Sequence, residues 1–286
     1  MPLLFCLSSA AAPPVVRHTL APLPGMTRAE LAVTVHPLHP AATLVLAPGS
    51  NGDGKAMATD ANWIRFAEEK GLMLVGLSFA SETTALHGET GYYYAGKGSG
   101  KLLLDALDRL TQKPLPVLLY GFSGGAHFTA RFAEWKPERV AAWCAYSAGW
   151  WDVPAPSICQ PPGIVACGEI DGRLGASLFY FKAGRAVGRP WLWVGVPESG
   201  HVQDSRVAAF ARDYFAAILG RGKRPSNEPQ GGWVDIEEKT VATETPPFDQ
   251  PTTTGWLPDM RLFQKWKALT DDNAGGQTET SEDAKE

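Results

Sequence analysis

The sequence predicts an α/β protein in which helices flank a mostly parallel central sheet. Short apolar runs alternate along the chain with segments whose apolar residues recur at helical spacing, as in successive βαβ units. The chain has 286 residues, of which 44% are hydrophobic and 20% are charged, so most of it can bury a core. This length suits a single α/β domain with additional segments.

Apolar runs locate the strands, and helical spacing locates the helices between them. We predict strands at Leu31–His36, Leu44–Ala47, Met73–Leu77, Pro116–Tyr120, Val140–Tyr146, Gly163–Cys167 and Trp191–Val196. We predict helices near Ala58–Glu69, around Leu103–Leu110 with Ser99 as cap, after Ser123, over Ala176–Ala186 and around Val207–Ile218. Together these elements form one domain over residues 15–221.

A segment of different composition follows this domain. Residues 222–269 are polar and rich in proline and threonine, but they keep Trp233, Trp256 and Trp266. We expect this segment to pack on the domain as an extension, because it has too few apolar residues for a core of its own. Within it, Trp256–Leu269 is predicted to form a short helix. Residues 270–286 are acidic and polar, which predicts a disordered tail.

The N-terminal residues bear on the compartment of the protein. Residues 1–14 are apolar and then alanine-rich, like the end of a secretory signal peptide, although they lack its basic start. A remnant of such a signal would make the protein secreted or periplasmic, whereas a frayed terminus would leave it cytoplasmic. No apolar run approaches the roughly 20 residues of a transmembrane helix.

Charge and cysteine content exclude several classes of partner. The net charge is −4, with 26 basic and 30 acidic side chains and no basic stripe, which argues against nucleic acid as a partner. None of the four cysteines has the spacing of a zinc site, so we predict no metal. Cys144 is predicted to be a buried free thiol, and a Cys159–Cys167 bridge stays open. Nothing in the sequence indicates an oligomeric state.

The strongest functional motif is Gly121-Phe122-Ser123-Gly124-Gly125. It follows a predicted strand and precedes a predicted helix, which is the context of a nucleophile elbow. Glycines give the strained turn room, and the turn lifts the Ser123 hydroxyl clear of the sheet. The Gly124 N–H and the helix N-terminus then point at a developing oxyanion. Ser123 is therefore the predicted nucleophile.

A serine nucleophile needs a base and an acid, which in this context follow it in the order acid, then histidine. His201 lies in a loop after the last predicted strand of the domain and is the predicted base. Asp171 lies just after the strand Gly163–Cys167 and is the preferred acid, with Glu169 and Asp152 as rivals. The acid would accept a hydrogen bond from histidine Nδ1 and stabilise the imidazolium.

The remaining site residues come from loops at the same end of the sheet. The glycine-rich loop after Leu44–Ala47 is predicted to supply a second oxyanion donor, the N–H of Ser50, with Asn51 as the second choice and as a substrate contact. Aromatic residues crowd the neighbouring loops. Phe122, Tyr93 and Trp150 are predicted to line an acyl or aryl pocket, although ordinary packing is an equal alternative for each cluster.

These residues resemble those of the α/β-hydrolase superfamily, especially its dienelactone-hydrolase, polyhydroxybutyrate-depolymerase and feruloyl-esterase-like branches. The resemblance covers roughly Leu31–Gly220 and implies the α/β-hydrolase fold and no cofactor. Pro48-Gly49 stands where such enzymes often have His-Gly. Dienelactone hydrolases proper use a cysteine nucleophile, so Ser123 argues against that activity.

The sequence as a whole predicts a serine carboxylic ester hydrolase that acts through an acyl-enzyme. Its substrate is expected to be a small-molecule or polymeric ester with an aryl, feruloyl-like or polyester character. Two alternatives stay open. One is a serine peptidase or amidase with the same triad, and the other is a non-catalytic binding protein on a hydrolase scaffold.

Overall fold

The computed structural model describes residues 14–82, 91–156, 161–221, 231–242 and 253–271. Within these residues, eight strands form one sheet in the order β1-β2-β4-β3-β5-β6-β7-β8. Strand β2 pairs antiparallel with β1 and with β4, and all the pairs from β4 to β8 are parallel. The strands are β1 Val16–Thr19, β2 Met26–Val35, β3 Ala42–Ala47, β4 Leu72–Ser81, β5 Val117–Phe122, β6 Val140–Tyr146, β7 Gly163–Gly168 and β8 Trp191–Val196.

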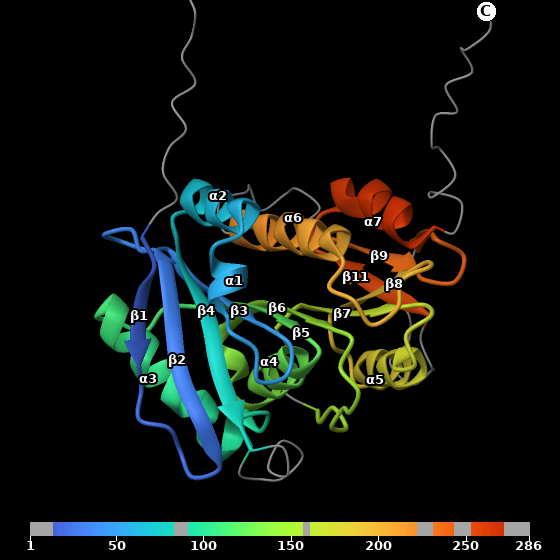
Figure 1. Ribbon diagram of the computed structural model, residues 1–286. Coiled ribbons are helices and arrows are strands. Elements are labelled where there is room, and N and C mark those ends of the chain that lie inside the picture. The colour runs from blue at the N-terminus through green and yellow to red at the C-terminus, as the bar shows by residue number, and fades with distance from the viewer. Residues whose placement is uncertain (1–13, 83–90, 157–160, 222–230, 243–252, 272–286) are drawn as a thin grey trace, which may run out of the picture.

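Helices cover both faces of this sheet (Figure 1). One face carries α1, α2 and α6, and the other carries α3, α4 and α5. The bounds are α1 Lys55–Ala58, α2 Ala61–Lys70, α3 Ser99–Thr111, α4 Gly124–Trp135, α5 Leu174–Ala186 and α6 Ser205–Arg221. Strands β3 to β8 are almost wholly buried between these two layers, as the continuous apolar runs require. The structure is thus an α/β-hydrolase fold, with a mostly parallel central sheet flanked by helices.

The seven predicted strands all exist, with ends that differ by up to five residues, whereas β1 and three short strands after residue 231 are not predicted by the sequence. The helix predicted near Ala58–Glu69 corresponds to α2, which begins only at Ala61 because Asp60 caps it by accepting hydrogen bonds from the N–H groups of Asn62 and Trp63. The short helix α1 before it is not predicted by the sequence. Ser99 is not a cap. Gly98 occupies that position, and the Ser99 hydroxyl donates to the carbonyl of Tyr92 at 2.8 Å.

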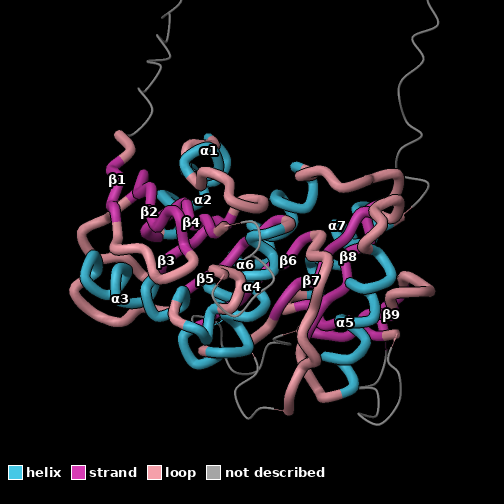
Figure 2. Tube along the Cα trace, turned by 60° about the horizontal axis from the view of Figure 1, so that its bottom comes forward, coloured by secondary structure: helices cyan, strands magenta, loops and turns pink. Residues whose placement is uncertain are grey.

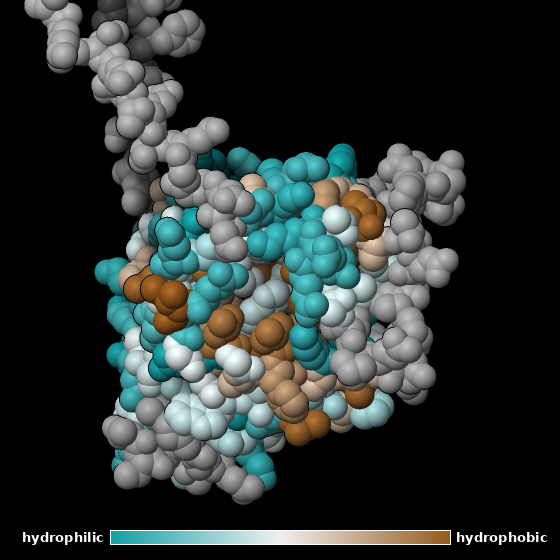
Figure 3. Space-filling model, turned by 90° about the vertical axis from the view of Figure 1, so that its right-hand side faces the viewer, coloured by the Kyte–Doolittle hydropathy of each residue, from teal (hydrophilic) through white to brown (hydrophobic). Residues whose placement is uncertain are grey.

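The described part of the C-terminal segment packs against the last strand of the sheet (Figure 2). A small antiparallel sheet of β9 Gly232–Asp235, β10 Thr240–Ala242 and β11 Thr254–Leu257 lies beside β8, with helix α7 Phe263–Thr270 next to it. The predicted helix over Trp256–Leu269 is therefore wrong in its first half, which is strand and a 3₁₀ turn. Figure 3 shows the side of the molecule on which this segment lies, and there apolar side chains interrupt the polar surface.

Two tight contacts join this segment to the domain. Trp266 is fully buried, and its indole Nε1 donates to the carbonyl of Trp193 in β8 at 2.9 Å. The buried Arg185 guanidinium donates to the carbonyl of Thr254 at 2.9 Å and lies 4.1 Å from the centre of the Trp233 ring. Thr270, predicted to begin the tail, is instead buried at the end of α7. Residues 272–286 lie outside the described residues.

Other predictions concern cysteines and membranes. Cys144 is a buried free thiol, as predicted, and so is Cys167. Cys159 and residues 1–13 lie outside the described residues. No helix in the described ranges is long and apolar enough to span a bilayer.

We expect Trp266→Ala to lower the free energy of unfolding by about 3–5 kcal/mol, because it leaves a large cavity and removes the hydrogen bond to Trp193. Urea denaturation measures this change. Gln264→Ala, at an exposed position of the same helix, is the matched control and should change stability little. A Trp266→Ala protein within 1 kcal/mol of wild type, roughly the margin for surface substitutions, would show that the segment adds no stability.

Candidate active site

Ser123 lies in a strained turn between β5 and α4. Its backbone has φ 52° and ψ −112°, a conformation that non-glycine residues rarely adopt. Two glycines make the turn feasible. A Cβ at Gly121 would lie 2.3 Å from the carbonyl oxygen of Gly125, and a Cβ at Gly125 would lie 2.0 Å from the carbonyl oxygen of Ala47. The strand, the turn and the first turn of the helix therefore pack backbone against backbone, as a nucleophile elbow requires.

The structure brings the three predicted catalytic side chains together. His201 Nε2 lies 3.0 Å from Ser123 Oγ, and His201 Nδ1 lies 2.8 Å from Asp171 Oδ2. An ionised carboxylate only accepts hydrogen bonds, so a neutral His201 carries its proton on Nδ1. That leaves the lone pair of Nε2 free to accept the Ser123 hydroxyl proton. This is the arrangement in which a histidine activates a serine.

Asp171 is held as a carboxylate by several donors. Its side chain is fully buried, and its Oδ1 accepts from the backbone N–H of Arg173 at 3.1 Å and from Arg173 Nη1 at 3.0 Å. Burial alone would raise its pKa. The hydrogen bonds from His201 and Arg173 outweigh burial and lower the pKa of Asp171 below its ordinary value. Its contribution to stability is therefore present above the unfolded-state pKa and is lost as pH falls through the lower folded-state pKa.

Neither rival acid contacts His201 in the structure. Both Asp152 oxygens accept hydrogen bonds from Arg131, at 2.7 and 3.0 Å. The Glu169 side chain is exposed and lies toward Gly195. Arg131 lies on α4, well before Asp152 in the sequence, so no local sequence signal reveals this pairing.

The backbones of Gly124 and Ser50 approach each other closely beside Ser123. The position that a Cβ at Gly124 would occupy lies 2.6 Å from the backbone nitrogen of Ser50. Within the described part of the chain, neither the Gly124 N–H nor the Ser50 N–H has an acceptor. The Asn51 N–H, by contrast, donates to the Tyr92 hydroxyl at 3.2 Å. The N–H groups of Ser50 and Gly124 are therefore left without an acceptor in these residues, whereas the N–H of Asn51 is occupied.

Asn51, which the sequence also predicts to contact substrate, holds its own loop in place. Its side-chain oxygen accepts from the Ser81 N–H at 3.0 Å, and its side-chain nitrogen donates to the Ser81 carbonyl at 2.9 Å. Asn51 has a φ of 56°, which asparagine tolerates better than most residues. Its amide thus fastens the loop to β4.

Further residues that sequence analysis missed fasten the same loop. Arg28 of β2 donates to the carbonyls of Asn51 and Gly52, at 2.7 and 2.5 Å. Asp53 accepts from Ser78 Oγ at 2.9 Å and pairs with Arg17 at 2.6 Å. The hydrogen bond from Arg17 lowers the pKa of Asp53 to about 2, so Asp53 stays an acceptor in all but strongly acidic solution.

Phe122 and Tyr93, predicted to contact substrate, mainly support other residues. The Phe122 ring stacks on the His201 imidazole, with ring centres 5.1 Å apart. Tyr93 is buried, its ring stacks on His127, and its hydroxyl donates to Ser50 Oγ at 2.9 Å. His127 is a buried residue of α4, and its Nε2 accepts the Gly149 N–H at 3.1 Å.

Trp150, together with Tyr93, borders a hollow that no triad residue lines. Its side chain is 61% exposed and lies 5.7 Å from His127, ring centre to ring centre. The hollow has a volume of about 440 Å³. Aromatic side chains and one ion pair line it: Tyr93, Tyr94, His127, Arg131, Trp150, Trp151 and Asp152.

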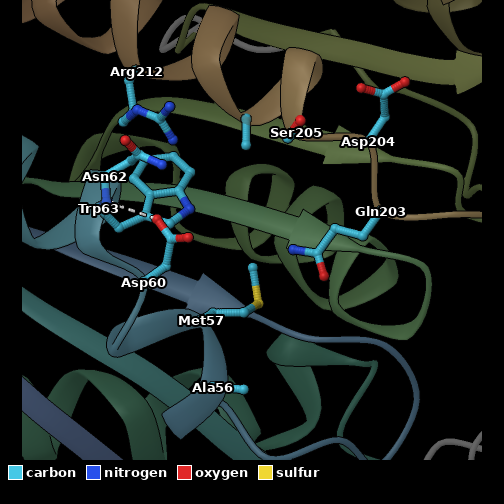
Figure 4. Close-up of a pocket in the computed structure, with 10 residues that line it drawn as sticks. Ala56, Met57, Asp60, Asn62, Trp63, Gln203, Asp204, Ser205 and Arg212 are labelled. Atoms are coloured by element: carbon cyan, nitrogen blue, oxygen red, sulfur yellow. Dashed lines mark hydrogen bonds between the residues drawn. The ribbon is translucent and has the colours of Figure 1, made fainter.

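A second hollow, of about 270 Å³, lies between α2 and the start of α6 (Figure 4). Arg212 and Trp63 meet at one end of it, with the guanidinium carbon 4.9 Å from the ring centre, and Gln203 lies at the other. Gln203 comes two residues after His201, but no triad residue lines this hollow. Across the described residues, no cluster of three or more histidine, cysteine or acidic side chains could hold a metal ion.

Comparison with known proteins agrees with this fold. The sequence matches no protein-family profile and no curated protein. Among solved structures, the chain is similar to a fluorophosphonate-binding serine hydrolase of Staphylococcus aureus, at 16% identity and a TM-score of 0.52, over 72% of this chain and 99% of that one. It is also similar to an esterase of Pyrobaculum calidifontis, at 14% identity and a TM-score of 0.55, over 73% and 86% of the two chains.

A third similar structure widens the range of chemistry. Dipeptidyl peptidase 4 of Porphyromonas gingivalis matches at 11% identity and a TM-score of 0.55, over 73% of this chain but 35% of its own. At such identities the likeness shows the α/β-hydrolase fold and leaves the bond cleaved to be argued from the site.

We expect Gly125→Ala to lower the free energy of unfolding by about 1–3 kcal/mol, the cost of an overpacked site, because the new methyl group meets the rigid carbonyl of Ala47. Gly175→Ala is the matched control. Gly175 is likewise the second residue of a helix, but no atom lies within 4 Å of its would-be Cβ. Thermal denaturation compares the two, and equal stability of both variants would contradict the close packing of the elbow.

Proposed function

We propose that this protein is a serine carboxylic ester hydrolase that works through an acyl-enzyme. One observation carries the proposal: Ser123 Oγ, His201 and the buried Asp171 carboxylate form an unbroken chain of contacts at 3.0 and 2.8 Å. Ser123 sits in a strained backbone conformation beside two N–H groups that have no acceptor in the described residues. Strain and unsatisfied donors at one place are typical of a catalytic site and are costly elsewhere.

Each side chain has a defined task in this proposal. Ser123 Oγ attacks the ester carbonyl carbon while His201 Nε2 takes its proton, and the carbonyl electrons move onto the oxygen. The N–H groups of Gly124 and Ser50 stabilise that oxyanion. His201 then gives its proton to the leaving alkoxide, which departs as an alcohol. Water, activated by His201 in the same way, hydrolyses the acyl-enzyme and regenerates Ser123.

We expect Ser123→Ala to fold normally and to lower kcat by a factor of about 10⁴ or more. Asp171→Asn should cost about 10⁴-fold, because it presents the wrong histidine tautomer. Asp152→Asn should cost far less, since Asp152 pairs with Arg131. Initial rates on a p-nitrophenyl ester measure all three. More than about a tenth of the activity left in Ser123→Ala would reject Ser123 as nucleophile.

Two measurements separate the ester hydrolase from its alternatives. A fluorophosphonate probe should label the wild type and leave Ser123→Ala unlabelled, and an unlabelled wild type would favour the binding protein. An ester and an amide with the same acyl group should differ strongly in kcat/KM, with the ester preferred. Equal or better cleavage of the amide would favour the peptidase or amidase.

The rim of the site supports a bulky apolar substrate. Ile170 directly precedes Asp171 and is 72% exposed, and Val202 directly follows His201 and is 57% exposed. They place apolar side chains in solvent next to two members of the proposed triad, and Trp150, on the loop after β6, is also exposed. Exposed apolar side chains gathered at a site are typical of contact with an apolar ligand. We therefore propose aryl or polymeric esters as substrates, in preference to acetyl esters.

We expect Trp150→Ala to lower kcat/KM for an aryl ester about tenfold, the equivalent of 1.4 kcal/mol, and to change acetyl ester turnover little. Val153→Ala is the control, because Val153 is exposed on the same loop but lines no hollow near the site. Rates on both esters for both variants decide the question. Equal losses on the two esters would mean that Trp150 supports the loop and does not contact the acyl group.

A further inference from the structure

The contact between Tyr93 and Ser50 has no role in the mechanism above. Tyr93 belongs to the loop after β4, and Ser50 belongs to the loop after β3. The Tyr93 hydroxyl donates to Ser50 Oγ at 2.9 Å. A phenol has a single O–H proton, and Tyr93 therefore uses it in the hydrogen bond to the Ser50 hydroxyl.

The place where they meet is the proposed oxyanion hole. The position of a Cβ at Gly124 would lie 2.6 Å from the Tyr93 hydroxyl oxygen and 2.6 Å from the Ser50 nitrogen. The Tyr93 hydroxyl thus borders the same small space as the two backbone donors. Ser50 Oγ lies 2.9 Å from that hydroxyl, and Ser50 Cα lies 2.6 Å from the same Cβ position.

The remaining hydroxyl proton is the one on Ser50. Since Ser50 Oγ accepts from Tyr93, its own O–H is left to donate elsewhere. Ser50 is exposed, and its hydroxyl has no acceptor among the residues that the structure describes. Such a hydroxyl beside an oxyanion hole can donate a hydrogen bond when negative charge develops there.

The tyrosine side of the contact is rigidly held. Tyr93 is 4% exposed, with its ring stacked on His127 at 4.9 Å and packed edge-on against Tyr92 at 4.7 Å. Burial, and then the neighbouring Tyr93, raise the pKa of the Tyr92 phenol, which keeps Tyr92 protonated. The Tyr92 oxygen accepts the Asn51 N–H. The two tyrosines therefore fix both the backbone and the side chain of the loop that carries Ser50.

We propose that the Ser50 hydroxyl is a third oxyanion donor and that Tyr93 is the positioning residue that orients and polarises it. This inference rests on the proposed ester hydrolase. Hydrogen bonds in a chain strengthen one another, so the Tyr93 hydroxyl makes the Ser50 hydroxyl a better donor. The bond to the oxyanion forms only as the carbonyl oxygen becomes charged, so its effect falls on kcat more than on KM.

The test is a set of variants that remove one hydroxyl at a time. We expect Ser50→Ala, which keeps the backbone N–H, to lower kcat about 10- to 100-fold with little change in KM. Ser50→Thr restores the hydroxyl and should recover most of the activity. Tyr93→Phe keeps the stacked ring and should lower kcat about tenfold. Tyr214→Phe, which removes another buried phenol hydroxyl far along α6, is the matched control and should leave kcat unchanged.

The double variant Ser50→Ala with Tyr93→Phe distinguishes a relay from two separate effects. In a relay, the double variant is no slower than Ser50→Ala alone, because Tyr93 acts only through the Ser50 hydroxyl. If the kcat of the double variant falls by the product of the two single-variant factors, the relay is refuted. The affinity for an arylboronic acid, which forms a tetrahedral adduct with a serine, should fall in parallel with kcat, and an unchanged affinity would also overturn it.

Failure of this inference and failure of the proposed function give different results. If the wild type reacts with a fluorophosphonate and cleaves esters while Ser50→Ala keeps kcat within twofold, the third donor is refuted and the hydrolase stands. If the wild type neither reacts nor cleaves, both are refuted. Melting temperatures within about 2 °C of the wild type, roughly the shift that 1 kcal/mol produces in a domain of this size, ensure that kcat reports the site and not unfolding.

Discussion

The close approach between the first turn of α4 and the end of β3 is the constraint on which the site depends. The Gly125 backbone lies so near the Ala47 carbonyl that a Cβ does not fit between them. This contact brings the loop after β3 beside the turn after β5, and hence the Ser50 N–H beside Gly124. Without it, the two backbone donors would come from loops that do not meet, and Ser123 would have no partner for a charged intermediate.

The loop that carries Ser50 is held from the antiparallel side of the sheet. Arg28 and Asn51 connect it to β2 and β4 through backbone carbonyls and N–H groups, which leaves little freedom to the loop. Donors fixed before the reaction need no reorganisation when charge develops. The antiparallel strands, which carry none of the proposed catalytic residues, thus serve the site by holding its donors in place. The position of the Ser50 N–H therefore depends on residues of β2 and β4 that lie outside the triad.

Features that neighbouring residues determine could be predicted from the sequence, whereas contacts between residues far apart in the sequence could not. The elbow around Ser123 could be predicted because a strained turn requires glycines at fixed positions before and after the serine. The position of Asp171 just after a predicted strand favoured it over Asp152 as the acid. The ion pair between Asp152 and Arg131 is visible only in the structure. The loop-holding role of Asn51 has no local signal either, because its amide bonds to Ser81, 30 residues away. Likewise, no local pattern tells that the first half of Trp256–Leu269 adds a strand beside Gly232–Asp235.

The position of the C-terminal segment has a consequence for solubility. Strand β8 is the last strand of the large sheet, and a bare edge strand offers its backbone to any other extended chain. Here β11 and α7 lie over it, and the Trp266 indole occupies the carbonyl of Trp193. At the opposite end the sheet closes with the short strand β1 of four residues. Both borders of the sheet are thereby made poor templates for the edge-to-edge association that begins aggregation.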